Sequence, residues 1–150
     1  ARTREYRFDI ERLGPRGSAA ADWAGHQAGL RDLAVGCFGA STGAAAALIA
    51  AAERPQRIRA VVSRGGRPDL AGDALSRVEA PTLLIVGGDD EPVIELNRDA
   101  MRQMRAHVEL AIVPGATHLF EEPGTLEQVE RLAADWFTRY LGQPAAGPQP

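Results

Sequence analysis

Four short apolar segments recur along the chain, and a segment of different character follows each of them. The apolar segments are 33–38 (LAVGCF), 58–63 (IRAVVS), 82–88 (TLLIVGG) and 108–116 (VELAIVPGA). After three of them the sequence predicts a helix: over 42–54, which is rich in alanine, over 92–106, and over 123–141, which has one broad apolar face. Strands that are apolar from end to end are typical of parallel sheets buried on both faces. The alternation therefore predicts an α/β fold, with a parallel sheet covered by helices.

The spacing of large apolar residues predicts which helix faces meet this sheet. For 92–106 the expected core residues are Val93, Leu96, Met101 and Met104; for 123–141 they are Leu126, Val129, Leu132, Trp136, Phe137 and Tyr140. The segment after 58–63, RGGRPDLAG, is expected to be a loop. A weaker helical pattern covers 18–30, and the tail 142–150 (GQPAAGPQP) is expected to be disordered.

Length and composition exclude several classes of function. A chain of 150 residues is expected to form one domain, and its net charge of −3 favours neither a nucleic-acid partner nor an anionic membrane surface. All 17 basic residues are arginine, which excludes a lysine Schiff base and the lysine of a phosphate-binding P-loop. No apolar stretch is long enough to cross a membrane. The one cysteine forms no intrachain disulfide, and a cytoplasmic location is expected.

A glycine-framed serine lies where the first apolar segment gives way to a helix. The residues Gly39-Ala40-Ser41-Thr42-Gly43 have the pattern G-x-S-x-G. A serine on such a strand-to-helix turn is a nucleophile elbow, in which the backbone N–H of the following residue, here Thr42, stabilises an oxyanion. The alternative is a turn serine with a structural role only.

The next strand ends supply a base and an acid for this serine. Asp89 and Asp90 directly follow 82–88, and His118 lies in the loop after the fourth strand. Functional groups gather at the carboxyl ends of parallel strands, and the chain order Ser, Asp, His is the order of α/β-hydrolases. Read singly, the aspartates are helix N-terminal charges and His118 a surface histidine. Together, in this order, they predict a catalytic triad.

Other functions fit the same residues less well. The glycines do not form the G-x-G-x-x-G pattern of a dinucleotide-binding turn, and no histidine–cysteine cluster has metal-ligand spacing. The acidic pair 89–90 is similar to that of a phosphoribosyltransferase, but no Thr-Gly phosphate turn follows it. Cys37 is expected to be a small buried residue of the first strand. No metal or cofactor is expected.

The segments GASTGAAAAL, VVSRGGRPDLAG, APTLLIVGG and IVPGATHLFEEPGTLE resemble the dienelactone hydrolase-like branch of the α/β-hydrolases. The resemblance covers roughly residues 8–141. It implies a nucleophile at Ser41, an acid at Asp90 rather than Asp89, and a base at His118. Dienelactone hydrolases carry cysteine at the elbow, whereas this chain carries serine, so the substrate stays open.

The resemblance also implies strands before the elbow that this sequence does not display. Residues 1–141 therefore look like the carboxyl-terminal two-thirds of a hydrolase domain, and 142–150 like a tail. Two functions follow: a serine hydrolase acting on a carboxylic ester or related acyl bond, or a catalytically silent fragment that needs a missing segment. The first strand would then be an exposed sheet edge, through which the chain is expected to self-associate.

Two arginines are candidates for binding a small-molecule acyl substrate. Arg64 and Arg67 lie in the loop after 58–63, at the same edge of the sheet as Ser41. A guanidinium group binds a carboxylate through two parallel hydrogen bonds, so either side chain is a candidate to hold an acidic substrate. The alternative is that both are solvated loop residues.

Overall fold

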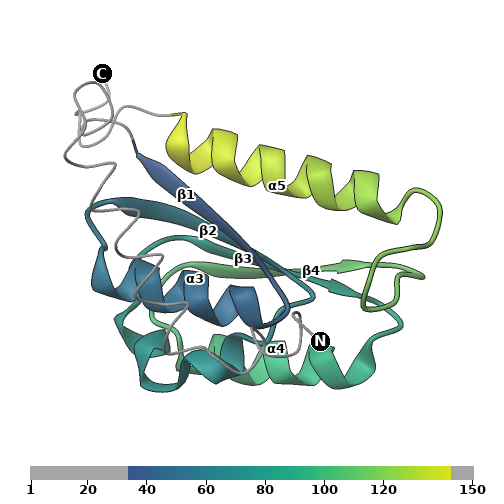
Figure 1. The fold of residues 1–150 in the computed structure, drawn as a ribbon, viewed down its shortest axis with the longest axis horizontal. Coiled ribbons are helices and arrows are strands. Elements are labelled where there is room, and N and C mark those ends of the chain that lie inside the picture. The colour runs from purple at the N-terminus through teal and green to yellow at the C-terminus, as the bar shows by residue number, and fades with distance from the viewer. Residues whose placement is uncertain (1–33, 143–150) are drawn as a thin grey trace, which may run out of the picture.

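The computed structural model describes residues 34–142. The helix expected over 18–30 and, apart from Gly142, the tail expected over 142–150 lie outside the described residues. Within them, four strands form one parallel sheet in the order in which they occur along the chain (Figure 1). The strands are β1 (Val35–Ala40), β2 (Ile58–Arg64), β3 (Thr82–Gly87) and β4 (Val108–Val113). The predicted α/β class with a parallel sheet is confirmed.

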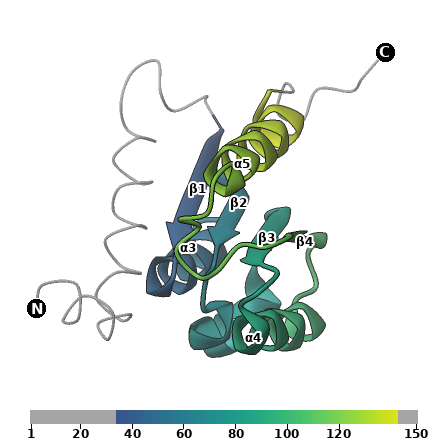
Figure 2. The same ribbon diagram turned by 90° about the vertical axis from the view of Figure 1, so that its right-hand side faces the viewer.

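Helices cover both faces of this sheet. The helices α3 (Thr42–Glu53) and α4 (Glu91–Gln103) lie on one face, and α5 (Thr125–Leu141) crosses the other (Figures 1 and 2). From Ala60 onward the side chains of β2 alternate between two hydrophobic clusters: Val61 joins the cluster beneath α3, whereas Ala60 and Val62 join the cluster beneath α5. This is the period of two expected of a strand buried on both faces.

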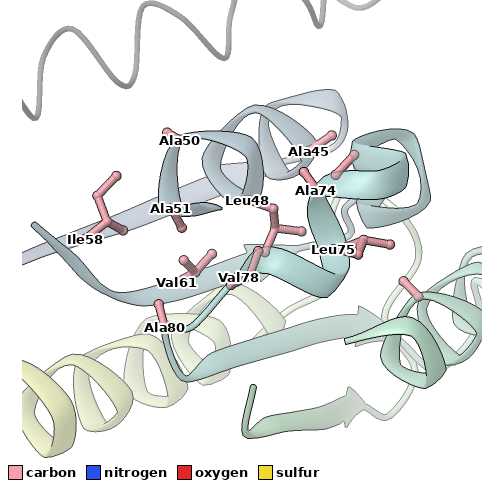
Figure 3. Close-up of a cluster of buried hydrophobic side chains, with 12 residues drawn as sticks. Ala45, Leu48, Ala50, Ala51, Ile58, Val61, Ala74, Leu75, Val78 and Ala80 are labelled. Carbon is pink, nitrogen blue, oxygen red and sulfur yellow. The ribbon is translucent and has the colours of Figure 1, made fainter. Parts of the chain in front are cut away.

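The cluster beneath α3 depends on small residues. Leu48 of α3 is fully buried and packs with Val61 of β2 and Leu75, while alanines supply much of the remaining contact surface (Figure 3). Alanine has the highest helix propensity and the smallest apolar side chain, so the run of alanines both forms α3 and lets it approach the sheet closely. Helix α3 begins immediately after Ser41.

The ends of the strands and helices differ from the sequence prediction by a few residues. Strand β1 spans 35–40 rather than 33–38, and β4 ends at Val113 rather than at 116 because a Pro-Gly turn follows. Helix α4 ends at Gln103 rather than at 106. Helix α5 begins at Thr125 rather than at 123 because Gly124 adopts a left-handed conformation with φ of 81°.

Two predictions about the helical layer were wrong. Part of the segment expected to be a loop forms a 3₁₀ helix, η1 (Pro68–Arg77), which is kinked at Gly72 and buries Ala71, Ala74 and Leu75. Helix α4 turns a different set of residues to the core, because Ile94, Asn97 and Ala100 are buried whereas Val93, Leu96 and Met101 are only partly buried. Met104, the residue after the helix, packs against the cluster beneath α3 as expected. Asn97 is not among the core residues expected from the apolar pattern, and its burial rotates the face that packs on the sheet.

Helix α5 follows its predicted face except at its first turn. Val129 and Trp136 are buried, and Leu132, Phe137 and Tyr140 pack against the same cluster, but Leu126 is 43% exposed. Within the described residues β1 and β4 are the edge strands, and Phe38 and Ile112 on them are exposed. Self-association through a sheet edge stays a prediction. No helix between residues 34 and 142 has the length and apolar character that a membrane span requires.

Candidate active site

Ser41 lies on a strained turn between β1 and α3. Its φ of 50° and ψ of −124° belong to a region that residues with a side chain rarely occupy. Such conformations cost about 1–3 kcal/mol and persist where the surroundings enforce them, often at active sites. The Thr42 N–H follows at the start of α3, where it has no acceptor within the helix. The turn therefore places a hydroxyl beside a free helix N-terminus.

The two glycines of the G-x-S-x-G pattern do different things. A Cβ placed on Gly39 would lie 2.6 Å from the carbonyl carbon of Gly43 and 2.7 Å from the Cα of Ala44, closer than real Cβ atoms approach backbone. Gly39 is therefore required because the end of β1 touches the first turn of α3. A Cβ on Gly43 would meet nothing within 4 Å. The sequence pattern does not distinguish these roles.

Replacing each glycine by alanine should separate the two roles. Gly39→Ala should destabilise the fold by about 1–3 kcal/mol, since it forces β1 and α3 apart, and should displace Ser41. Gly43→Ala is the matched control; it should be neutral or stabilise α3 by about 0.5–1 kcal/mol. Urea unfolding followed by circular dichroism measures both changes. Equal effects at the two positions would contradict the proposed contact between strand and helix.

Three of the predicted residues meet in one hydrogen-bonded row. The Oγ of Ser41 lies 3.0 Å from Nε2 of His118, and Nδ1 of His118 lies 3.0 Å from Oδ2 of Asp90. Asp90 is mostly buried, with 13% of its side chain exposed, whereas Asp89 is exposed. The structure therefore places Asp90, and not Asp89, against the imidazole.

This row fixes the tautomer of His118. A carboxylate only accepts hydrogen bonds, so Nδ1 must carry the proton that is donated to Asp90. In the neutral ring Nε2 is then an acceptor, positioned to receive the proton of the Ser41 hydroxyl. Asp90 also stands immediately before α4, where the helix dipole favours negative charge.

The loop that follows β2 holds the nucleophile and the base together. The N–H of Arg67 donates to the Ser41 carbonyl at 3.0 Å, and the N–H of Ser41 donates to the Arg64 carbonyl at 3.4 Å. A Cβ on Gly65, whose φ is 52°, would lie 3.4 Å from Nδ1 of His118. The side chain of Asn97, which is buried in α4, donates to the carbonyl of Gly66 in this loop at 3.2 Å. Sequence reasoning missed this role of Asn97, because only its burial reveals it.

A carboxylate that sequence reasoning also missed anchors the loop of His118. Glu122 accepts hydrogen bonds from the N–H and the hydroxyl of Thr117, at 2.9 and 2.8 Å. These bonds hold the pKa of Glu122 below its usual range. Because the folded pKa is depressed, their stabilisation is present above the unfolded pKa and is lost as the pH falls through the folded pKa. The anchoring of this loop therefore weakens under acid.

A cavity of about 480 Å³ opens onto Ser41. Besides the serine–histidine–aspartate row, Thr42, Arg67, Leu70 and Val93 line it. Leu70 belongs to η1 and Val93 to α4, so both helical segments contribute an apolar wall. The cavity is large enough for a small organic substrate, with the serine hydroxyl at its wall.

The two candidate substrate-binding arginines have separate positions. Arg67 lines the cavity, and both oxygens of the Asp69 carboxylate accept hydrogen bonds from its guanidinium, at 2.9 and 2.8 Å. Arg64 does not line the cavity; its guanidinium lies 5.7 Å from the centre of the Phe120 ring. Within residues 34–142 no cluster of three or more histidine, cysteine or acidic side chains is arranged to hold a metal ion.

Cys37 lies within β1, as expected, and is partly buried. Burial raises the pKa of its thiol, which keeps the thiol protonated and unreactive. His107 is exposed, donates from Nε2 to Glu109 at 2.9 Å and stacks on Trp136. Both residues therefore lie apart from the row formed by Ser41, His118 and Asp90.

Comparison with known proteins gives a family and a fold. The sequence profile of the dienelactone hydrolase family matches residues 6–141. The crystal structure of a dienelactone hydrolase from Anabaena variabilis is 58% identical, with a TM-score of 0.89 over 93% of this chain and 65% of that one. A dienelactone hydrolase-like promiscuous phosphotriesterase from metagenomic libraries is 20% identical, with a TM-score of 0.70 over 93% of this chain and 66% of that one. At that identity the second match shows the fold alone.

A longer relative carries a different name. A Mycobacterium tuberculosis protein, provisionally named a phosphoribosyl transferase, is 58% identical over 143 residues. The match covers 95% of this chain but 32% of that protein. This chain thus spans about a third of the length of the curated relative and about two thirds of the Anabaena enzyme.

Proposed function

Because the chain belongs to the dienelactone hydrolase family, we propose that it is a serine hydrolase that cleaves a carboxylic ester or related acyl bond. Ser41 is the nucleophile, His118 the general base and acid, and Asp90 the residue that orients His118. The family and the esterases and lipases that share this fold support a hydrolase. The specificity for carboxylic esters and the roles of Ser41, His118 and Asp90 are what we propose.

The observation that carries the proposal is the row of hydrogen bonds from Ser41 through His118 to Asp90, both of 3.0 Å. A serine hydroxyl is a weak nucleophile unless a base removes its proton, and the base needs a partner that fixes its tautomer. His118 and Asp90 lie where both requirements need them, at one edge of the sheet. The strained backbone of Ser41 is a further feature that this chemistry explains.

The reaction follows from these positions. As the Ser41 oxygen attacks the acyl carbon, its proton passes to Nε2 of His118 and the carbonyl oxygen becomes an oxyanion beside the Thr42 N–H. The tetrahedral intermediate collapses when His118 returns the proton to the departing alcohol, which leaves an acyl group on Ser41. Water then attacks this ester with His118 again as base, and release of the acid restores the hydroxyl.

The cavity walls support a substrate with a small apolar acyl group. Leu70 and Val93 line the cavity beside Ser41, so burial of an alkyl chain against them is favourable. A space of about 480 Å³ admits a chain of several carbons. Dienelactone itself is not proposed as the substrate.

Phosphoribosyl transfer is not proposed for this chain, although the longer Mycobacterium relative carries that name. This chain corresponds to 32% of that protein. The acidic pair Asp89–Asp90, which is similar to that of a phosphoribosyltransferase, does not act as a pair here. Asp90 is hydrogen-bonded to His118, whereas Asp89 is exposed. A cytoplasmic location and a hydrolase domain over residues 1–141 stay predictions.

Turnover of p-nitrophenyl butyrate, together with labelling by a fluorophosphonate, tests the proposed function. The protein should release p-nitrophenol above the uncatalysed rate, and peptide mapping should find the phosphonyl adduct on Ser41. Denatured protein is the control for non-specific labelling.

The competing function, a catalytically silent hydrolase fold, makes the opposite prediction. The family resemblance places a second oxyanion N–H before the elbow, and loss of one such donor costs about 10²–10³ in rate. A folded protein that neither hydrolyses the ester nor reacts at Ser41 would contradict the serine hydrolase and support the silent fold. Labelling at a different residue would contradict the assignment of the nucleophile.

A further inference from the structure

Arg67, which is paired with Asp69, has no part in the proposed reaction, yet it lines the cavity. Arg67 directly precedes η1, and Asp69 lies in the first turn of that helix. The guanidinium donates from Nε to one carboxylate oxygen at 2.9 Å and from Nη2 to the other at 2.8 Å. This two-point geometry is the strongest form of an arginine–carboxylate pair.

The pair changes the charge that a substrate meets. The side chains of Arg67 and Asp69 are 39% and 23% exposed, so solvent screens them only in part. The hydrogen bonds that Arg67 donates to Asp69 raise the pKa of Arg67. The two opposite charges lie in direct contact and offset each other. When His118 is neutral, Arg67 is the one cation among the described residues that line the cavity. Asp90 adds a negative charge to the same lining. The cavity therefore has no surplus positive charge.

We propose that Asp69 determines substrate specificity: by pairing with Arg67 it leaves the acyl cavity without a free cation, and so selects uncharged acyl groups over acyl groups that carry a carboxylate. This proposal rests on the proposed hydrolase function and names its substrate class. A carboxylate in the cavity would meet an Arg67 whose charge is already offset by Asp69, and it would be repelled by Asp69 and by Asp90. An uncharged chain packs on Leu70 and Val93 without either cost.

The proposal reverses the simplest expectation for Arg67. An arginine at a substrate cavity is expected to bind a substrate carboxylate. A guanidinium that already binds a carboxylate of the protein attracts a second carboxylate much less. The N–H groups left on Arg67 still donate to an uncharged oxygen. If Asp69 instead oriented Arg67 toward an acidic substrate, removing Asp69 would weaken the binding of that substrate, and the experiment separates the two cases.

Two esters of equal chain length measure the preference. p-Nitrophenyl hexanoate is uncharged, and mono-p-nitrophenyl adipate carries a carboxylate at the end of its acyl chain. Wild type should prefer the hexanoate. Asp69→Asn keeps the shape of the side chain but frees the charge of Arg67, so the ratio of kcat/KM for hexanoate to that for adipate should fall by on the order of tenfold. The change should shrink as salt is added.

Two further variants exclude trivial causes. Asp73→Asn removes an equal charge from an exposed position of the same helix and should leave the ratio unchanged. In Arg67→Met/Asp69→Asn no cation is freed, so the gain for the adipate should disappear. Thermal unfolding by circular dichroism verifies that each variant is folded.

A binding measurement keeps this proposal separate from the catalytic one. NMR titration with hexanamide and with adipic acid monoamide reports occupation of the cavity whether or not esters are hydrolysed. Asp69→Asn should bind the anionic amide on the order of tenfold more tightly and hexanamide as before. An unchanged or weaker affinity for the anionic amide would overturn the role of Asp69. Absence of ester turnover with the expected binding change would overturn only the hydrolase.

Discussion

Replacement of Ser41 by alanine should lower kcat for p-nitrophenyl butyrate by about 10⁶-fold, to the level that binding and the oxyanion site alone supply. Alanine removes the oxygen that lies 3.0 Å from Nε2 of His118 and leaves the rest of the row in place. Fluorophosphonate labelling should disappear with the activity. Turnover or labelling that persists in Ser41→Ala would show that another residue is the nucleophile.

Comparison of alanine with glycine at the same position tests the backbone strain. Alanine keeps a Cβ at φ of 50°, so it keeps the strain, whereas glycine relieves it. Ser41→Gly should be as inactive as Ser41→Ala but more stable by about 1 kcal/mol, after allowance for the greater freedom of glycine in the unfolded chain. Equal stability in urea unfolding would contradict strain at the elbow.

The fold could be predicted from the sequence because its main signals are periodic. Each strand is an apolar run, α3 is a run of alanines, and α5 has a regular apolar face, so local propensity and burial agree. The errors lie where they disagree. The sequence predicts a loop where η1 forms, because glycine and proline dominate its start and Gly72 interrupts it.

The error in α4 has a different cause. Asn97 is fully buried, and its amide donates to the carbonyls of Gly66 and Val93 at 3.2 and 2.7 Å. A buried polar side chain needs such partners, and the partner Gly66 is remote in sequence. Helical periodicity reads asparagine as a surface residue, so the predicted apolar face was displaced from the observed one. Only the packing of α4 against the loop after β2 reveals the role of Asn97.

The candidate site also has a part that the sequence predicts and a part that only the structure reveals. Strand ends bring Ser41, Asp90 and His118 to one edge of the sheet. Chain order predicts a serine, an acid and a histidine there, whereas the choice of Asp90 over Asp89 comes from the family resemblance. The residues that position them or shape the cavity, such as Asp69 and Glu122, act through contacts that no short motif records. Arg67 shows the limit most clearly, since its place at the cavity was predictable but its pairing with Asp69 was not.

Replacement of Asp90 by asparagine should lower kcat by about 10⁴-fold, whereas the same change at Asp89 should have little effect. An amide at position 90 can turn its NH₂ group toward Nδ1 of His118, which favours the ring tautomer whose proton lies on Nε2. That tautomer cannot accept the proton of Ser41. The carboxylate of Asp90 lies 3.0 Å from Nδ1, and Asp89 is exposed, so only one of the two neighbours controls the tautomer.

The two aspartates form a matched pair, because each variant removes one charge at the same end of β3. Asp90 precedes α4 but its side chain makes no capping hydrogen bond, so Asp90→Asn removes no cap and should unfold at the same urea concentration as Asp89→Asn. Steady-state kinetics with p-nitrophenyl butyrate give the ranking, and the rate of fluorophosphonate labelling of Ser41 should fall in parallel with kcat. A larger loss in Asp89→Asn would identify the other carboxylate as the partner of His118. Equal, small losses would mean that the hydrogen bond between His118 and Asp90 does not control the proton transfer.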